Sequence, residues 1–283
     1  MTIIEDRQKE LTAYIDSVIE KYTPKAGYPD IIYEAVRYSL FGGGKRVRPM
    51  LAVMTSDMLG GDRSFIEPLF SAVEMIHTYS LIHDDLPAMD NDDYRRGRYT
   101  SHKQFGEAMA ILAGDALLNM AYETMLGAAQ GKDRRYLSAC SLIAESAGIK
   151  GMVGGQAADI GNDETCRDGK VLEFIYANKT TALIRAAVLT GASSADISED
   201  DFLALDEFSR HLGLIFQLTD DVQDMNGDVP EEGKATYGAV IGRQGCIDWV
   251  AELKDRALKL LDRFGSRADE LRGYTEAIAS RVH

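Results

Sequence analysis

Hydrophobic residues recur along this chain at spacings of three and four, the pattern of helices that face a core. The clearest run begins at Ile66, with apolar residues at positions 66, 69, 70, 73 and 76 and no period-two alternation. The same pattern predicts further helices, over residues of about 5–20, 30–40, 50–59, 105–128, 134–150, 170–191, 199–225 and 245–264.

Short turn signals separate the predicted helices, and no long linker or internal repeat divides the 283 residues. With 45% hydrophobic and 27% charged residues, the chain has enough apolar material for a buried core. We therefore predict an all-α fold, a single-domain helical bundle over residues 1–283 with its helices packed around a central cavity or core.

A net charge of −14 argues against a nucleic-acid partner, because phosphate backbones are bound by basic surfaces. The N-terminus lacks the apolar stretch of a signal peptide, and charges interrupt every apolar run before about 20 residues. The three cysteines form no CxxC pair, as expected of free thiols. We expect no membrane span and a location in the cytoplasm.

The segment DDLPAMDNDD places Asp84, Asp85 and Asp90 at the C-terminal end of the helix that contains Ile66. On a regular helix, residues 84 and 90 would point about 240° apart, so a shared metal cluster requires a deformed helix. Pro87 can cause this deformation, because proline removes a backbone donor and crowds the preceding turn. We predict a distorted turn there.

A second acidic segment, DDVQD, carries Asp220, Asp221 and Asp224 after a run that is apolar at helical spacing. Asp220 and Asp224 are i, i+4 neighbours on one face. A single acidic run would be most simply a solvated helix end, but two such runs favour a cleft with Mg²⁺ bound to carboxylate oxygens. Since magnesium also takes phosphate oxygens, a diphosphate substrate is implied.

Basic residues stand close to the first acidic segment in the sequence. Lys45, Arg46 and Arg48 follow three glycines, an arrangement typical of an anion site, since glycines let the backbone approach a ligand. His77 lies seven residues before Asp84 and therefore on nearly the same helical stripe. Further candidates for diphosphate oxygens are Arg95 and Arg96.

Four segments in this order resemble the short-chain trans-polyprenyl diphosphate synthase family. They are GGGKRVRP at 42–49, DDLPAMDNDDYRRG at 84–97, Lys179-Thr180 and FQLTDDVQD at 216–224. The resemblance covers nearly the whole chain and implies an isoprenoid synthase fold, a helical bundle around a deep cavity. It also implies a magnesium-dependent prenyltransferase that joins isopentenyl diphosphate to an allylic diphosphate.

The resemblance further implies the roles of single residues. Lys45, Arg48 and His77 would hold isopentenyl diphosphate with help from Arg96, while Arg95, Lys179 and Lys234 would contact the allylic diphosphate. Three Mg²⁺ ions per site are expected with diphosphate bound, and the six ligands are Asp84, Asp85, Asp90, Asp220, Asp221 and Asp224. Thr180 and Gln217 resemble the residues beside the allylic cation.

Product length is expected to depend on Tyr79 and Ser80, which precede Asp84 by five and four residues, about 6 to 7.5 Å along a helix. An aromatic ring at position 79 resembles farnesyl diphosphate synthases of the bacterial type, so we predict a C15 product, with geranylgeranyl diphosphate as the alternative. Tyr79 could instead pack against a helix or a neighbouring subunit.

One departure from the family is a contracted segment, NGDVPEEGKATY, after the second acidic motif, in which Lys234 matches only the later of two expected lysines. It leaves open a non-catalytic partner subunit of a synthase, although both acidic motifs are intact. A terpene cyclase is the other alternative, but it would have no reason to retain GGGKRVRP. The family leads us to expect a homodimer.

Overall fold

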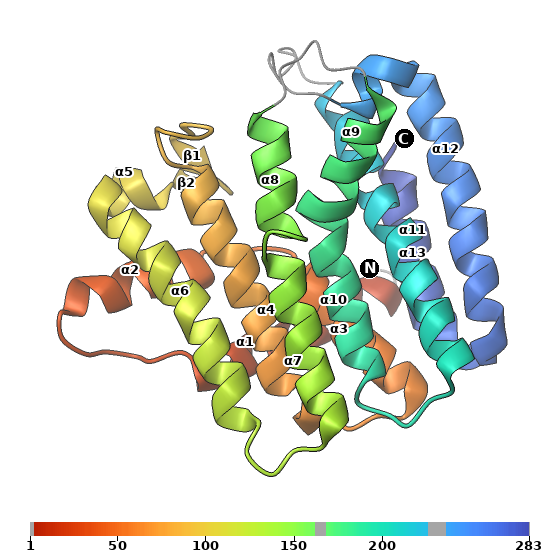
Figure 1. The fold of residues 1–283 in the computed structure, drawn as a ribbon, viewed down its shortest axis with the longest axis horizontal. Helices are drawn as coiled ribbons and strands as arrows, with labels where there is room; N and C mark the ends of the chain where they lie inside the picture. Colours follow the sequence, from red (N-terminus) through yellow and green to blue (C-terminus); the bar gives the residue numbers. More distant parts are fainter. Residues whose placement is uncertain (1–2, 162–167, 226–235, 283) are drawn as a thin grey trace. The chain divides into compact units, whose positions relative to one another are not determined.

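A computed structural model describes residues 3–161, 168–225 and 236–282. The described part is almost entirely helical, with a single two-stranded hairpin, which confirms the predicted all-α class (Figure 1). None of the described helices combines the length and the apolar character that a membrane crossing needs.

The chain forms two compact units. Unit 1 comprises Met1–Met50 and Arg63–Cys140, and unit 2 comprises Leu51–Asp62 and Ser141–His283. Two helices, α3 (Val47–Leu59) and α7 (Arg134–Ala147), contribute residues to both units. The single domain over residues 1–283 stays a prediction.

Unit 1 is organised around α4 (Arg63–Asp84). Its side chains are buried on nearly every face from Phe65 to Ile82, as expected of a helix with neighbours on all sides. Its neighbours include α1 and α2, and α6 lies beside it along its length (Figure 1). The other elements are α1 (Ile3–Tyr22), α2 (Asp30–Leu40), β1 (Tyr94–Arg95), β2 (Arg98–Tyr99), α5 (Ser101–Phe105) and α6 (Glu107–Ala128).

Unit 2 is organised around α10 (Ala182–Ala192), in which ten of the eleven residues are buried. It packs on α11, and α11 in turn packs along α12. The other elements are α8 (Met152–Ile160), α9 (Gly169–Ile175), the π-helix η1 (Tyr176–Thr181), α11 (Glu199–Asp224), α12 (Tyr237–Leu261), the 3₁₀-helix η2 (Asp262–Ala268), α13 (Asp269–Ala279) and η3 (Ser280–Val282).

Glycine accounts for two differences from the predicted helices. The helix predicted over 105–128 is α6, which begins two residues later because Gly106, with a φ of 86°, separates it from α5. Helix α8 was not predicted, because its sequence MVGGQAADI carries two glycines, which lower helix propensity. Helix α12 begins eight residues earlier than predicted, and the short α13 was missed.

Arg46 has a structural role in unit 1, although the sequence groups it with the cations of the glycine-rich loop. It is only 4% exposed. Its guanidinium donates hydrogen bonds of 2.8 Å to Asp16 Oδ1, to Glu74 Oε1 and to the carbonyl oxygen of Leu40. Its φ of 48° is rare outside glycine, so these bonds hold a strained backbone between α2 and α3.

We therefore expect Arg46→Met to lower the free energy of unfolding by about 3 to 5 kcal/mol, because it leaves the buried Glu74 carboxylate uncompensated. Urea denaturation measures this change. The double variant Arg46→Met/Glu74→Met should recover much of the loss, since both charges are then gone. Arg256→Met, which removes an exposed pair with Glu252, should cost less than about 1 kcal/mol. An equally small loss for Arg46→Met would contradict the structural role.

Candidate active site

The first acidic motif follows the end of α4 in unit 1. Beyond Asp84 the chain leaves the helix and turns back, so that the backbone N–H of Asp90 donates to the carbonyl oxygen of Asp84 at 2.8 Å. The carbonyl oxygen of Leu86 accepts from Met89 and from Asn91, at 2.8 and 3.1 Å. This loop is the distorted turn predicted around Pro87, and it returns residue 90 to the helix end.

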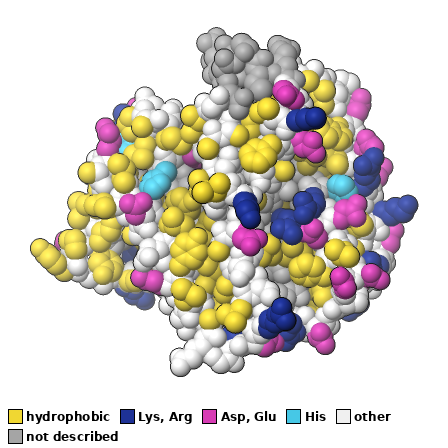
Figure 2. Space-filling model, in the orientation of Figure 1, with side chains coloured by type: hydrophobic (Ala, Val, Ile, Leu, Met, Phe, Trp, Pro, Cys, Tyr) yellow, Lys and Arg dark blue, Asp and Glu magenta, His cyan; other side chains and the backbone are white. Residues whose placement is uncertain are grey.

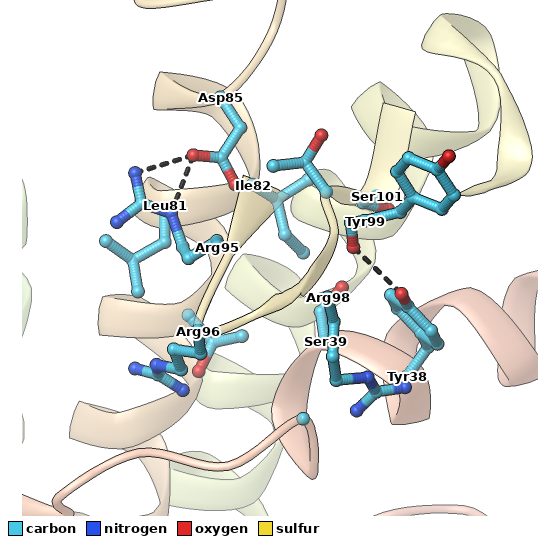
Figure 3. A pocket seen from close by; sticks show the side chains of 13 residues that line it. Tyr38, Ser39, Leu81, Ile82, Asp85, Arg95, Arg96, Arg98, Tyr99 and Ser101 are labelled. Atoms are coloured by element: carbon cyan, nitrogen blue, oxygen red, sulfur yellow. Dashed lines mark hydrogen bonds and ion pairs between the residues drawn. The ribbon is translucent and has the colours of Figure 1, made fainter. Parts of the chain in front are cut away.

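Asp85 differs from the other two carboxylates of this motif in being buried, with 3% exposure, whereas Asp84 is partly buried and Asp90 is exposed. Arg95 Nε donates to Asp85 Oδ1 at 2.6 Å, as the dashed lines in Figure 3 mark. Burial raises the pKa of Asp85, and the charge of Arg95 opposes this rise. The arginine therefore offsets part of the cost of burying this carboxylate.

The hairpin β1–β2 holds Arg95 and Arg96 over α4. It is fixed at its base, where Thr100 Oγ1 donates to the carbonyl oxygen of Asp92 at 2.7 Å. On the other side, the hydroxyl of Tyr38 on α2 donates to the carbonyl oxygen of Tyr99 at 2.8 Å (Figure 3). A small cleft lies between the hairpin, α2 and α4, and both arginines line it.

The glycine-rich loop approaches the hairpin closely. Arg96 donates from Nη1 to the carbonyl oxygen of Gly43. A Cβ atom at Gly44, whose φ is 136°, would lie 2.6 Å from the same nitrogen, so this position requires glycine. Of the two cations expected to hold isopentenyl diphosphate, Lys45 is exposed in the loop and Arg48 is 9% exposed in the first turn of α3.

His77 lies on α4 within the field of these arginines. Burial holds the pKa of His77 well below its usual value, and the charges of Arg48, Arg96, Arg95 and Arg46 lower it further. The imidazole is therefore neutral near pH 7 and acts as a hydrogen-bonding group rather than as a cation. Unit 1 thus brings His77 and three of the predicted anion-binding arginines into one neighbourhood.

In unit 2 the Lys179-Thr180 pair lies in the π-helix η1, a wide turn of a kind often found at functional sites. Lys179 Nζ makes a hydrogen-bonded ion pair with Asp159 on α8. The two elements approach so closely that a Cβ atom at Gly155 would lie 2.2 Å from the backbone nitrogen of Lys179. Asp159 was missed, and its only sequence signal is an acidic residue after the glycines of α8.

Thr180 and Gln217, predicted to lie together, are in direct contact. Thr180 Oγ1 donates to Gln217 Oε1 at 2.6 Å. Close packing between η1 and α11 permits this contact, since a Cβ atom at Gly213 would lie 2.6 Å from the Thr181 side chain. The two oxygen-bearing side chains form a polar pair without a strong nucleophile.

The second acidic motif ends α11. Asp220, which is about one-third exposed, accepts a 2.9 Å hydrogen bond from Arg281 in η3, and Asp224 is exposed. Asp221 is buried, and burial raises its pKa to about 6, against hydrogen bonds from Tyr176, Gln217 and Gly238. Tyr176 and Arg281 were missed by the sequence analysis.

The remaining predicted residues divide into two cases. Tyr79 is 6% exposed on α4, and Ser80 donates to the carbonyl oxygen of His77 at 2.9 Å. Lys234 lies outside the described residues. Within residues 3–161, 168–225 and 236–282, no three His, Cys, Asp or Glu side chains are grouped closely enough to hold a metal ion by themselves.

Comparison with known proteins relates this arrangement to one enzyme family. Residues 29–239 match the polyprenyl synthetase family. The chain is 41% identical over 267 residues to geranylgeranyl pyrophosphate synthase 7, chloroplastic, of Arabidopsis thaliana, covering 89% of this chain and 77% of the plant protein. It is 38% identical over 298 residues to farnesyl diphosphate synthase of Geobacillus stearothermophilus, covering 99% of this chain and 98% of that protein.

Solved structures agree with these relatives. An FPP/GFPP synthase from Zymomonas mobilis matches with a TM-score of 0.90 and 36% identity, covering 97% of this chain and 98% of that one. This match confirms the expected isoprenoid synthase fold. The chain therefore belongs to the polyprenyl synthetase family and is a trans-prenyltransferase.

Proposed function

We propose that this protein condenses isopentenyl diphosphate with dimethylallyl or geranyl diphosphate and releases farnesyl diphosphate, a C15 product. The observation that carries the product length is the buried aromatic ring of Tyr79, five residues before Asp84 on α4. Geranylgeranyl diphosphate is the alternative product, since relatives named for both activities resemble this chain.

The carboxylates of the two acidic motifs fit magnesium by their chemistry. Mg²⁺ prefers oxygen ligands, keeps several waters and is completed by phosphate oxygens, so one or two carboxylates from each motif are enough to hold an ion. The turn that returns Asp90 to Asp84 also supports a shared ion. We assign magnesium, as three ions per site with diphosphate bound, to five of the six predicted carboxylates, those of Asp84, Asp85, Asp90, Asp220 and Asp224; the sixth, Asp221, is buried and hydrogen-bonded within the protein. When bound, magnesium supplies electrostatic stabilisation of the departing diphosphate.

Isopentenyl diphosphate is assigned to the basic groups of unit 1. Arg48 and Arg96 supply charge-assisted hydrogen bonds to phosphate oxygens, and Lys45 adds a third cation from the glycine-rich loop. Neutral His77 adds a hydrogen bond and no charge. Such a local cluster lets an acidic protein attract an anion.

Contacts to the allylic diphosphate are assigned to Arg95, Lys179 and Lys234. Arg95 is paired with Asp85 and Lys179 with Asp159. Each cation is therefore already desolvated in part and oriented by a carboxylate, so it gives up less hydration when it turns to a phosphate oxygen.

Loss of the diphosphate leaves an allylic cation, which the double bond of isopentenyl diphosphate attacks before a proton is lost. Thr180 and Gln217 are assigned to the side of this cation, because their oxygen dipoles stabilise positive charge without trapping it. The released diphosphate is the expected proton acceptor.

The growing tail is expected to stop at Tyr79. At 1.5 Å per residue its Cα lies about 7.5 Å down the helix from Asp84, a distance that suits a few isoprene units. The ring packs edge-on against His83, with centroids 5.7 Å apart, and burial raises the pKa of the hydroxyl to about 12. The side chain of Tyr79 is therefore uncharged and held by its contact with His83, as a barrier to the growing tail requires.

A homodimer and a cytoplasmic location stay predictions. Unit 1 offers an apolar surface on α6, where Ile111, Leu112 and Leu126 are 45 to 66% exposed, and Figure 2 shows hydrophobic side chains over this helix. A second copy that covers this helix face would account for the exposure. Sedimentation that finds only monomer would contradict the dimer.

Purified protein incubated with Mg²⁺, isopentenyl diphosphate and geranyl diphosphate should yield farnesol after dephosphorylation, detected by mass spectrometry. Tyr79→Ala should shift the main product to geranylgeraniol or longer alcohols, because the wall of the pocket is removed. Tyr79→Phe is the matched control, since it keeps the ring and should keep the C15 product. Geranylgeraniol from the wild type, or an unchanged product from Tyr79→Ala, would refute the assignment of length to Tyr79.

Acid should destabilise the wild type through His77. Because its pKa is lowered on folding, the unfolded chain binds a proton that the folded chain does not, and stability is lost as pH falls below about 6.5. The wild type should therefore be less stable at pH 5.5 than at pH 7.5. Urea denaturation of the wild type and His77→Gln at pH 7.5 and 5.5 measures it, and the variant should lack this component. An equal pH dependence of both proteins would mean that His77 is not held neutral.

A further inference from the structure

The carboxylate of Asp221 is surrounded by hydrogen-bond donors of the protein itself. The hydroxyl of Tyr176 donates to Oδ2. The backbone N–H of Gly238 also reaches Oδ2, at 3.4 Å, and Gln217 Nε2 reaches Oδ1 at 3.5 Å. Asp221 is only 4% exposed, so little of its carboxylate faces water.

The neighbouring carboxylates of the motif lie in a different environment. Asp220 and Asp224 are one helical turn apart on α11, and residue 221 points about 100° away from residue 220. Asp220 is about one-third exposed and Asp224 is exposed. The side chain of Asp221 instead reaches η1 and the first turn of α12.

Tyr176 connects η1, to which it belongs, with α11 and α12. It is the first residue of η1 and is 4% exposed. Its hydroxyl donates to Asp221 and accepts from the backbone N–H of Tyr237 at 3.1 Å. The rings of Tyr176 and Tyr237 pack edge to face at 4.8 Å, and Trp249 extends the stack at 4.9 Å. This buried hydroxyl therefore has a hydrogen-bond partner both as a donor and as an acceptor.

We propose that Asp221 and Tyr176 form a positioning pair and that Asp221 does not bind magnesium. The pair fixes the π-helix that presents Lys179 and Thr180, and Gln217 joins it to the polar pair beside the proposed cation. Metal binding by this motif is left to Asp220 and Asp224. The inference rests on the proposed function, since only a diphosphate site makes DDVQD a metal-binding motif.

Metal binding tests the proposal independently of turnover. Mn²⁺ takes the same oxygen ligands as Mg²⁺, so free Mn²⁺ can be followed by electron paramagnetic resonance with inorganic pyrophosphate present. Asp220→Asn should lose one ion or weaken Mn²⁺ binding at least tenfold. Asp221→Asn should keep the wild-type number of ions and an affinity within about threefold, because the amide oxygen still accepts from Tyr176. Loss of an ion in Asp221→Asn, as in Asp220→Asn, would overturn the proposal.

Kinetics test the positioning role. Tyr176→Phe keeps the ring and removes the hydroxyl, so it should lower kcat at least tenfold while the Mg²⁺ concentration for half-maximal rate stays unchanged. Tyr237→Phe is the matched control, since it alters the neighbouring ring and keeps the backbone donor; its kcat should stay within about twofold. The double variant Tyr176→Phe/Asp221→Asn should have a kcat close to that of the slower single variant. Wild-type kcat in Tyr176→Phe would refute the role.

The same experiments separate this inference from the proposed function. If the wild type neither binds Mn²⁺ with pyrophosphate nor forms product, the proposed function fails. If the wild type does both, and Asp221→Asn loses an ion, only the assignment of Asp221 fails. Thermal melting of each variant accompanies both measurements, and should Asp221→Asn not fold, Mn²⁺ binding by Tyr176→Phe at the wild-type level remains the required result.

Discussion

A carboxylate removed from water must be paired, and this constraint runs through both units of the protein. Glu74 is paired with Arg46, Asp85 with Arg95, Asp159 with Lys179 and Asp221 with the hydroxyl of Tyr176. Leaving Glu74, the most deeply buried of these acids, without Arg46 would cost about 3 to 5 kcal/mol, which is a large part of the stability of a typical domain. The fold therefore has to bring distant segments together before these acidic side chains can be buried.

In two of these pairs the cation is also assigned a role in the proposed reaction. Arg95 and Lys179 each pair with a carboxylate, and both are assigned to a diphosphate. A cation that is already oriented and partly desolvated needs little reorganisation to contact an anion. By contrast, the buried pair of Arg46 and Glu74 involves neither acidic motif and stabilises the loop that carries Lys45 and Arg48.

Sequence periodicity was enough to predict the all-α class, because α4 and α11 have long apolar stripes. It also located the acidic motifs at the ends of those helices, and the turn at Pro87 followed from the properties of proline. It could not distinguish Arg46 from Arg48, since their separation depends on Asp16 and Glu74, which lie far away in sequence. Asp159, Tyr176 and Arg281 were missed for the same reason, because their contacts span 20, 45 and 61 residues.

The π-helix explains why local pattern was insufficient at the most critical segment. A continuous helix over 170–191 was predicted, and the chain is helical there, but the wide turn at Tyr176–Thr181 changes which side chains share a face. Glycines on two neighbouring helices, Gly155 and Gly213, allow this turn to be packed from both sides. Since a π-helical turn is rare compared with an α-helix, contacts such as Tyr176 with Asp221 are needed to favour it here. The chemistry assigned to Lys179 and Thr180 thus depends on a buried acid that itself need not touch the substrate.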